Sequence, residues 1–243
     1  MKKYLYEDLH RSEDSHWWHV SKRRAVFNLI KKYRSSKSLK ILDVGCGSGR
    51  NLKEFQKLGI GHGLDLSPLA IDYCRQIGLK NLKLGRAERT TFKNNYFNIV
   101  TVLDVLEHTD DKKTLKELKR ILKIDGLIIA TVPAFKFLWS RWDEVLHHKR
   151  RYTVKSVKDL FLANGFSIVK ITYLYSFLVI PATITRKLKE KIYKEHYPSD
   201  FELTNGLLNM IFKYLASLEF LISKFIPMPF GTTILIVARK ENS

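Results

Sequence analysis

The chain has 243 residues, of which 45% are hydrophobic and 12% aromatic, values typical of a globular domain with a substantial core. Two cysteines exclude a disulfide framework and indicate a reducing, cytoplasmic compartment. No apolar segment follows Met1, so we do not expect secretion, and no apolar run reaches the ~20 residues of a membrane span. The formal net charge of +19 favours anionic partners, although a generally lysine-rich composition would give the same value.

The segment 41–49 combines a short apolar run, an acid and alternating glycines, in the sequence Ile-Leu-Asp-Val-Gly-Cys-Gly-Ser-Gly. This pattern predicts a buried strand that ends in a loop whose backbone approaches a ligand, followed by a helix over 51–58. The spacing is G-x-G-x-G, whereas a dinucleotide-binding loop has G-x-G-x-x-G. The motif alone therefore does not separate a ligand loop from a tight turn.

Further strands are predicted downstream, with acids or glycines at their ends: 62–65, 81–85, 97–104, 127–132, 166–174 and 232–238. A 3.6-residue apolar pattern at Leu115, Leu118 and Ile121 predicts a helix between two of them, and Thr153 is a good N-cap for another over 154–163. This alternation predicts an α/β fold with a parallel sheet and a ligand crevice along its carboxyl edge. Asp65 is placed to accept two ribose hydroxyls there.

Together these segments resemble the class I S-adenosylmethionine-dependent methyltransferases over residues 38–175. The resemblance implies a Rossmann-like, doubly wound sheet of seven strands, mostly parallel with the last strand antiparallel. It implies S-adenosyl-L-methionine as cofactor and S-adenosyl-L-homocysteine as product.

The resemblance also assigns cofactor contacts, which run along the strand ends. The methionine part would face Asp43, Gly45, Cys46, Gly47 and Gly49. The ribose would face Asp65, and the adenine would face Leu66, Ala87 and Glu88. The reactive sulfur would lie beside Asp104 and Val105.

The whole chain is predicted to be one methyltransferase domain. We expect an N-terminal helical cap or lid over 1–37, a cofactor-binding core over 38–174, a helical insert over 175–229, and a final strand and tail over 230–243. The insert replaces a hairpin between the last two strands. It has an apolar start, a basic stretch and an amphipathic stretch over 207–226 that suits a bilayer surface or an apolar substrate. A hairpin packed on its own sheet and a dimer interface are equally compatible alternatives.

The large apolar residues of that amphipathic stretch share one broad side of a helix: Leu207, Leu208, Ile211, Leu215, Leu218, Leu221, Ile222 and Phe225.

Aromatic and basic residues gather where an acceptor would bind, in the lid and in the loop after the fifth strand: Trp17, His19, Trp139, Trp142, Arg150, Arg151 and Tyr152. Paired arginines suit bidentate binding of a phosphate or carboxylate, although they could instead pair with Asp143 and Glu144. The loop also resembles a subgroup of methyltransferases associated with polysaccharide and lipid-linked glycan pathways.

Histidine is the side chain best matched to proton transfer at neutral pH, and His108 and His148 are the candidate bases, with His16 or His19 arriving on the lid. The fourth strand lacks the Asn/Asp-Pro-Pro-aromatic sequence of amino-methylating nucleic-acid enzymes. We therefore expect methyl transfer to an oxygen of a small-molecule or lipid-linked acceptor, in the cytoplasm or peripherally at the inner membrane face.

Two alternatives remain open. Asp104, Glu107, His108, His147 and His148 superficially resemble the metal ligands of RNA 2′-O-methyltransferases that modify small-RNA ends. Because Glu-His after the fourth strand also occurs in enzymes without a metal, we expect no metal site and regard nucleic acid as the less favoured partner. A non-catalytic cofactor-binding protein is disfavoured, since competent residues occupy every expected cofactor position.

Overall fold

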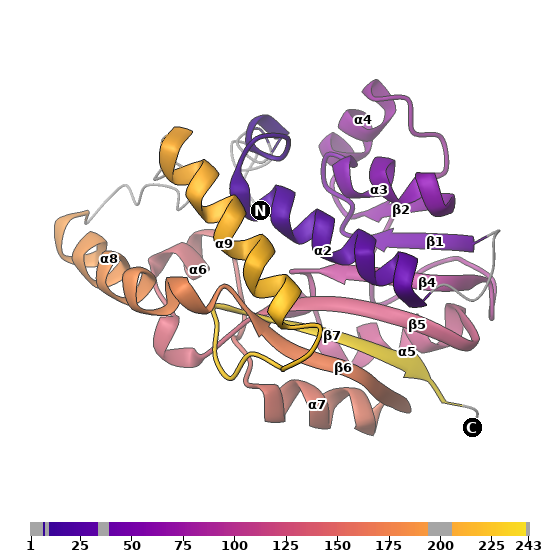
Figure 1. The fold of residues 1–243 in the computed structure, drawn as a ribbon. Coiled ribbons are helices and arrows are strands. Elements are labelled where there is room, and N and C mark those ends of the chain that lie inside the picture. The colour runs from indigo at the N-terminus through magenta and orange to yellow at the C-terminus, as the bar shows by residue number, and fades with distance from the viewer. Residues whose placement is uncertain (1–6, 8–9, 34–38, 194–205, 242–243) are drawn as a thin grey trace.

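A computed structural model of the chain describes residues 7, 10–33, 39–193 and 206–241. Its centre is a seven-stranded sheet with the order β3-β2-β1-β4-β5-β7-β6, shown in Figure 1. The strands are β1 Leu39–Val44, β2 Gly59–Asp65, β3 Leu82–Leu84, β4 Phe97–Leu103, β5 Leu122–Pro133, β6 Phe166–Leu174 and β7 Thr233–Lys240. Strands β1 to β5 pair in parallel, and β7 runs antiparallel to β5 and β6. The predicted fold is confirmed.

Helices cover both faces of the sheet: α2 Trp17–Tyr33, α3 Arg50–Phe55, α4 Pro68–Gln76, α5 Asp111–Ile121, α6 Arg141–Val145, α7 Val154–Ala163, α8 Val179–Ile192 and α9 Gly206–Ile222. Thr153 caps α7 as predicted, because its hydroxyl accepts a hydrogen bond from the Ser156 N–H at 3.1 Å. The helix expected over 51–58 is divided into α3 and a short 3-10 turn at Gln56–Leu58.

Alternate side chains of each central strand enter two different core layers. In β1, Leu39 and Ile41 pack toward α2 and α9, whereas Leu42 and Val44 pack toward α5 and α7. Strand β5 is buried over most of its length, as expected of a strand covered on both sides. It begins five residues earlier than predicted, because Leu122 already pairs with Phe97 before the register shifts.

The N-terminal helix α2 and the insert helix α9 lie side by side over one face of the sheet (Figure 1). The Trp17 N–H donates a hydrogen bond to Asn209 Oδ1 at 2.6 Å, and the Trp17 ring contacts Tyr175 and Phe212 edge-on. The carboxylate of Glu219 accepts hydrogen bonds from the backbone N–H groups of Tyr175 and Ser176. Helix α9 thus covers its own sheet, which is one of the arrangements left open by the sequence.

The face that α9 turns to the core is not the side that carries most of its large apolar residues. Its buried residues are Ala216 and Glu219, while Leu218 and Leu221 on the apolar side are 42% and 49% exposed. A small residue at 216 lets α9 approach α2 and the sheet closely, and Glu219 is held inward by the N–H groups that it binds. Leu218 and Leu221 therefore face outward, whereas Phe212 and Phe220 of the same helix pack against the core.

Candidate active site

A glycine loop joins β1 to α3 at the carboxyl edge of the sheet. Gly45, Gly47 and Gly49 have φ angles of +71°, +54° and +84°, which glycine adopts without strain. A Cβ atom at Gly45 would overlap the Val105 side chain, and one at Gly49 would lie 2.5 Å from Leu79. At Gly47 the nearest contact is Glu13 Oε1 at 3.4 Å, so this part of the loop is open toward the N-terminal segment.

Three acids surround this loop. Asp43 Oδ1 accepts a hydrogen bond from Thr101 at 2.6 Å, whereas its buried Oδ2 has no partner among the residues that the structure describes. Asp65 accepts hydrogen bonds from the Gly47 and Ser67 N–H groups at 3.0 and 2.9 Å. Glu13 accepts one from the Ser48 hydroxyl. Sequence reasoning missed Glu13, because only the folded chain brings this segment to the loop.

The electrostatics of these acids favour a cationic ligand. Burial raises the pKa of Asp43 to about 7 and that of Glu13 to about 7, and it also raises the pKa of Asp65. The cofactor that the resemblance implies carries a sulfonium and an ammonium group, which would favour the ionised carboxylates. The unpartnered Asp43 oxygen and the exposed backbone of the glycine loop therefore fit S-adenosylmethionine.

The other predicted cofactor residues lie along the same edge. Leu66 is 62% exposed directly after β2, Ala87 is buried and Glu88 is half-buried. Val105 packs against Gly45. The Cys46 side chain instead points into the contact with α4, where its Sγ lies 3.8 Å from Cys74 Sγ. Any contact of residue 46 with the cofactor is therefore made by its backbone.

The cap reaches the end of β4 through Lys22. This buried residue of α2 donates a hydrogen bond to Asp104, and its Nζ lies 3.0 Å from the centre of the Trp18 ring. Asp104 has a φ of +54°, an uncommon conformation for a non-glycine residue that marks the end of the strand. Trp17, predicted to contact the acceptor, packs instead among the aromatic residues of the insert. His19 is half-buried, and burial lowers its pKa.

The acceptor loop after β5 is organised around Asp143, a buried residue of α6. Arg151 donates two hydrogen bonds to its carboxylate at 2.8 and 2.9 Å and a third to the Ala134 carbonyl at 3.0 Å. His148 Nδ1 lies 2.8 Å from Asp143 Oδ1. Burial would raise the pKa of Asp143, but the hydrogen bonds from His148 and Arg151 and the charge of Arg151 lower it to about 2.

The remaining residues predicted to bind the acceptor differ in how exposed they are. Arg150 pairs with Asp111 at 2.6 Å but keeps 38% of its side chain exposed. The Tyr152 hydroxyl donates to the same Asp111 at 2.9 Å, and Tyr152 and Trp142 are buried. Trp139 is half-buried. Of the arginine pair, Arg150 is thus the member positioned to meet an anion, and acceptor binding by these residues remains a prediction.

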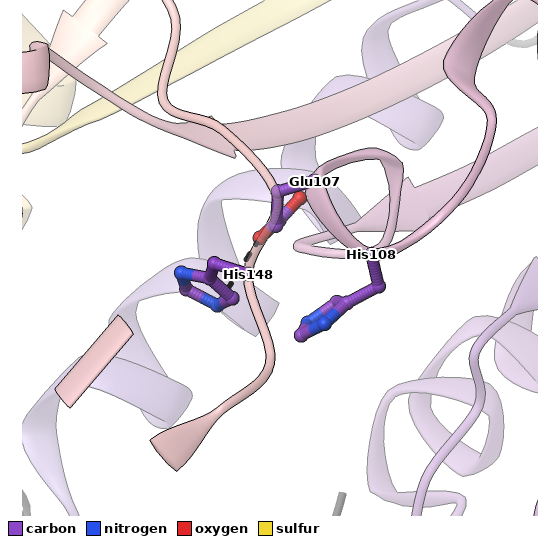
Figure 2. Close-up of side chains that lie close together, drawn as sticks. All are labelled: Glu107, His108 and His148. Atoms are coloured by element: carbon purple, nitrogen blue, oxygen red, sulfur yellow. Dashed lines mark ion pairs between the residues drawn. The ribbon is translucent and has the colours of Figure 1, made fainter. Parts of the chain in front are cut away.

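Figure 2 shows three further side chains that converge from two loops. Glu107 and His108 belong to the 3-10 turn Leu106–His108 after β4, and His148 belongs to the loop after α6. The His108 and His148 rings are 4.7 Å apart, and His148 Nε2 lies 4.0 Å from Glu107 Oε1. Burial and the charge of His148 lower the pKa of His108 to about 4. The neighbouring His147 is exposed and does not belong to this group.

Comparison with known proteins agrees with this geometry. The sequence profile of a family described as "Methyltransferase domain" matches residues 42–130. An uncharacterized protein of Methanocaldococcus jannaschii is 32% identical over 171 residues, which are 67% of this chain and 72% of that protein.

Solved structures share the fold. The Haloferax volcanii chain solved with the methyltransferase activator Trm112 is 17% identical, with a TM-score of 0.65 over 99% of this chain and 95% of its own. A SAM-dependent methyltransferase from Archaeoglobus fulgidus is 19% identical, with a TM-score of 0.56 over 90% of this chain and 94% of its own. The sheet order, the glycine loop with its acids and these relatives lead to one conclusion: the chain belongs to the class I S-adenosylmethionine-dependent methyltransferases and uses S-adenosylmethionine as its cofactor.

Proposed function

We propose that this enzyme methylates an oxygen of an anionic, lipid-linked small molecule held at a membrane surface. When bound, S-adenosylmethionine supplies a methyl group on a positively charged sulfur, which is already a strong electrophile. The protein must then orient the acceptor, exclude water and remove the proton of the hydroxyl.

The apolar surface of α8 carries this proposal. Ile180, Ile184, Leu188 and Ile192 are 72%, 54%, 52% and 68% exposed, and their spacing of four residues places them on one side of the helix. Such a continuous exposed apolar stripe is unusual on a soluble protein and marks an interaction surface.

Charge favours an anionic membrane as the occupant of this surface. Lys187 and Lys191 are exposed on α8 beside the apolar stripe, and the chain carries a net charge of +19. Apolar side chains flanked by lysines are typical of a helix that lies in the interface of an anionic bilayer. In the described part of the chain, every helix is too short or too polar to cross a bilayer.

Helix α9 also exposes apolar residues: Leu207, Met210, Ile211, Tyr214, Leu218, Leu221 and Ile222.

The exposed helix is attached to the acceptor loop. The Arg186 guanidinium donates a hydrogen bond to the Leu138 carbonyl at 2.7 Å, and Arg141 donates one to the Tyr193 carbonyl at 3.1 Å. Figure 1 shows α8 beside α6, beyond the end of the sheet at which β5 finishes. A membrane contact through α8 would therefore present lipid headgroups to the loop that contains Arg150.

The histidines support an oxygen acceptor. His108 is neutral at pH 7 because its pKa is lowered to about 4, so a ring nitrogen keeps a lone pair. His148 is oriented by Asp143 in the same way that a carboxylate orients a catalytic imidazole. We place the activation of the acceptor hydroxyl at these two residues.

Co-sedimentation with vesicles of phosphatidylglycerol and phosphatidylcholine tests the membrane contact. The double variant Ile184→Glu with Leu188→Glu should bind at least tenfold more weakly than the unmodified protein, and the loss should be larger than that caused by high salt alone. Leu162→Glu, at a 45% exposed leucine of α7, is the matched control and should bind normally. Point substitutions are preferable to removal of the insert, because α9 contributes Ala216 and Glu219 to the core.

A transfer assay tests the acceptor. The protein is incubated with methyl-labelled cofactor and, separately, with a lipid extract or with total small RNA. Label recovered in the organic phase supports the proposal. Label in RNA with none in lipid, or vesicle binding that the α8 variant leaves unchanged, would contradict it.

A further inference from the structure

We propose that Glu107, His108 and His148 form a binding site for a divalent transition-metal ion. The part of this inference that concerns the acceptor rests on the proposed function, because we infer that the ion binds and activates the acceptor hydroxyl. The metal site itself stands on geometry that is independent of the acceptor.

The three side chains supply one ligand atom each from two separate loops. These atoms, a carboxylate oxygen and two imidazole nitrogens, all lie within 4.8 Å of one another. Ligands of a tetrahedral zinc ion with bonds of about 2.0–2.2 Å are roughly 3.3 Å apart, so small side-chain rotations suffice to close the site. Figure 2 shows that both rings lie on the same side of Glu107.

The buried state of Glu107 calls for a cation. Its side chain has no exposed surface, and neither carboxylate oxygen accepts a hydrogen bond from any residue that the structure describes. Leaving such a group buried without partners costs several kcal/mol when it is charged. The charges of Lys22 and Arg151 act on Glu107 without a hydrogen bond to it, whereas a metal ion between Glu107 and the histidines would bind the carboxylate directly.

The surroundings of His148 resemble the second shell of a metal site. His148 Nδ1 lies 2.8 Å from Asp143 Oδ1 and its Nε2 lies 4.0 Å from Glu107 Oε1, so Nε2 is the ring nitrogen that is placed to bind a cation. Metal-binding histidines are commonly fixed by such a carboxylate. Asp143 is in turn held by two hydrogen bonds from Arg151, so the orientation of the ring is set before an ion arrives.

The donor set selects the class of metal. Two imidazoles and one carboxylate favour Mn²⁺, Fe²⁺, Co²⁺ or Zn²⁺ over Mg²⁺ and Ca²⁺, which prefer oxygen ligands. Three protein ligands leave coordination positions for other oxygens, as in catalytic rather than structural sites.

A metal ion at this site would give the proposed methyl transfer a specific way to activate the acceptor hydroxyl. An alcohol or phenol oxygen that binds the ion would lose its proton to solvent before water is excluded, because the ion stabilises the oxyanion, and the two histidines would then act through the ion as its ligands rather than as bases. As the oxygen–carbon bond forms, the carbon–sulfur bond breaks and the sulfur keeps the electron pair as a neutral thioether. The site lies in the turn that follows β4, close to Asp104, which the resemblance places beside the sulfur.

Cobalt binding tests the site directly. Protein without a histidine tag is stripped with a chelator and titrated with Co²⁺, and the visible d–d absorption and the bound metal per chain are measured. We expect one ion per chain, with affinity lowered at least tenfold in Glu107→Gln and in His108→Asn. Asp143→Asn should lower affinity by about 10- to 100-fold through the orientation of His148.

His147→Asn is the matched control, since this exposed histidine is adjacent to His148 in the sequence but lies outside the group. Retained binding of S-adenosylhomocysteine shows that each variant is folded. If the unmodified protein binds no Co²⁺, Mn²⁺ or Zn²⁺, or if His147→Asn weakens binding as much as His108→Asn, the site does not exist.

The two proposals fail in different ways. Lipid methylation that persists unchanged in chelator-treated protein overturns the metal site and leaves the proposed function standing. One bound ion with the expected variant pattern, together with no label in any lipid, supports the site and overturns the proposed function.

Discussion

Lys22 of α2 donates a hydrogen bond to Asp104, the residue that follows β4, and so joins the N-terminal cap to the centre of the sheet's carboxyl edge. Both partners are largely removed from water, with 6% and 22% of their side chains exposed. Burial lowers the pKa of Lys22, while the charge of Asp104 opposes this effect. Loss of either residue would therefore leave the other largely buried without its ion-pair partner.

Lys22→Met should lower the free energy of unfolding by about 1–3 kcal/mol, because it leaves the Asp104 carboxylate without its partner. It should also reduce methyl transfer, since the cap no longer closes on the strand end. Urea denaturation and single-turnover assays measure these effects. Arg24→Met, at an exposed position of the same helix, should change neither, and equal losses in both variants would show that the pair has no special role.

Gly47→Val and Asp65→Ala should each abolish cofactor binding with little loss of folding. Valine at residue 47 would occupy the open side of the glycine loop, and alanine at residue 65 removes the proposed ribose acceptor. Calorimetric titration with S-adenosylhomocysteine measures the loss. Gly78→Val is the control for backbone strain, because Gly78 has a φ of +84° and a Cβ atom there would meet no other atom within 4 Å. Unchanged affinity in both loop variants would remove the site.

The free protein should become less stable as the pH rises from about 6.5 to about 8, which is above the range in which His16 and His108, with pKa values lowered to about 4, add stability as the pH rises. Glu13 and Asp43, whose pKa values are raised to about 7, keep protons in the native state that the unfolded chain has already released near pH 4. The unfolded state thus binds fewer protons over this range, and the free energy of unfolding falls with pH.

Cofactor binding should show the opposite dependence on pH. A cationic ligand favours ionised carboxylates, so affinity for S-adenosylmethionine should rise through the same range. Affinity for S-adenosylhomocysteine, which lacks the sulfonium charge, should rise less. Thermal melting with and without each ligand provides the measurement, and Glu13→Gln should flatten both trends. If stability and cofactor affinity depend on pH in Glu13→Gln as they do in the unmodified protein, Glu13 is not the source of the two trends.

Arg150→Ala and Arg151→Ala should have different effects, although the two residues are adjacent. Arg151 is buried and holds Asp143, so its loss should destabilise the protein by about 3–5 kcal/mol. Arg150 is partly exposed, so its loss should weaken acceptor use and spare both folding and cofactor binding. Denaturation and KM for the acceptor separate the two outcomes. A loss of cofactor affinity in Arg150→Ala would assign this residue to cofactor binding instead of acceptor binding.

The sequence was sufficient to predict the sheet and the glycine loop, because both depend on local patterns. Alternating glycines, strand-ending acids such as Asp65 and the periodicity of Leu115 and Leu118 are each visible within a short window. The cap of α7 at Thr153 is equally local and was confirmed.

Long-range pairs could not be predicted in this way. Glu13 meets Ser48 and Lys22 meets Asp104 only after the chain has folded, and no spacing in the sequence encodes these contacts. The face of α9 that packs on the sheet could not be predicted for a related reason. Periodicity identifies the large apolar side of a helix, but burial here follows the small Ala216 and the hydrogen-bonded Glu219.

The division of the site along the chain has a consequence for how its specificity can change. The predicted cofactor contacts all fall in the first half of the chain, in short groups at the ends of successive strands from Asp43 to Val105. The predicted acceptor contacts come instead from α2 and the loop after β5, and the proposed membrane contact comes from the insert. Under the proposed membrane contact, an exchange of α8 alone should therefore direct the enzyme to a different surface while the chemistry of methyl transfer stays the same.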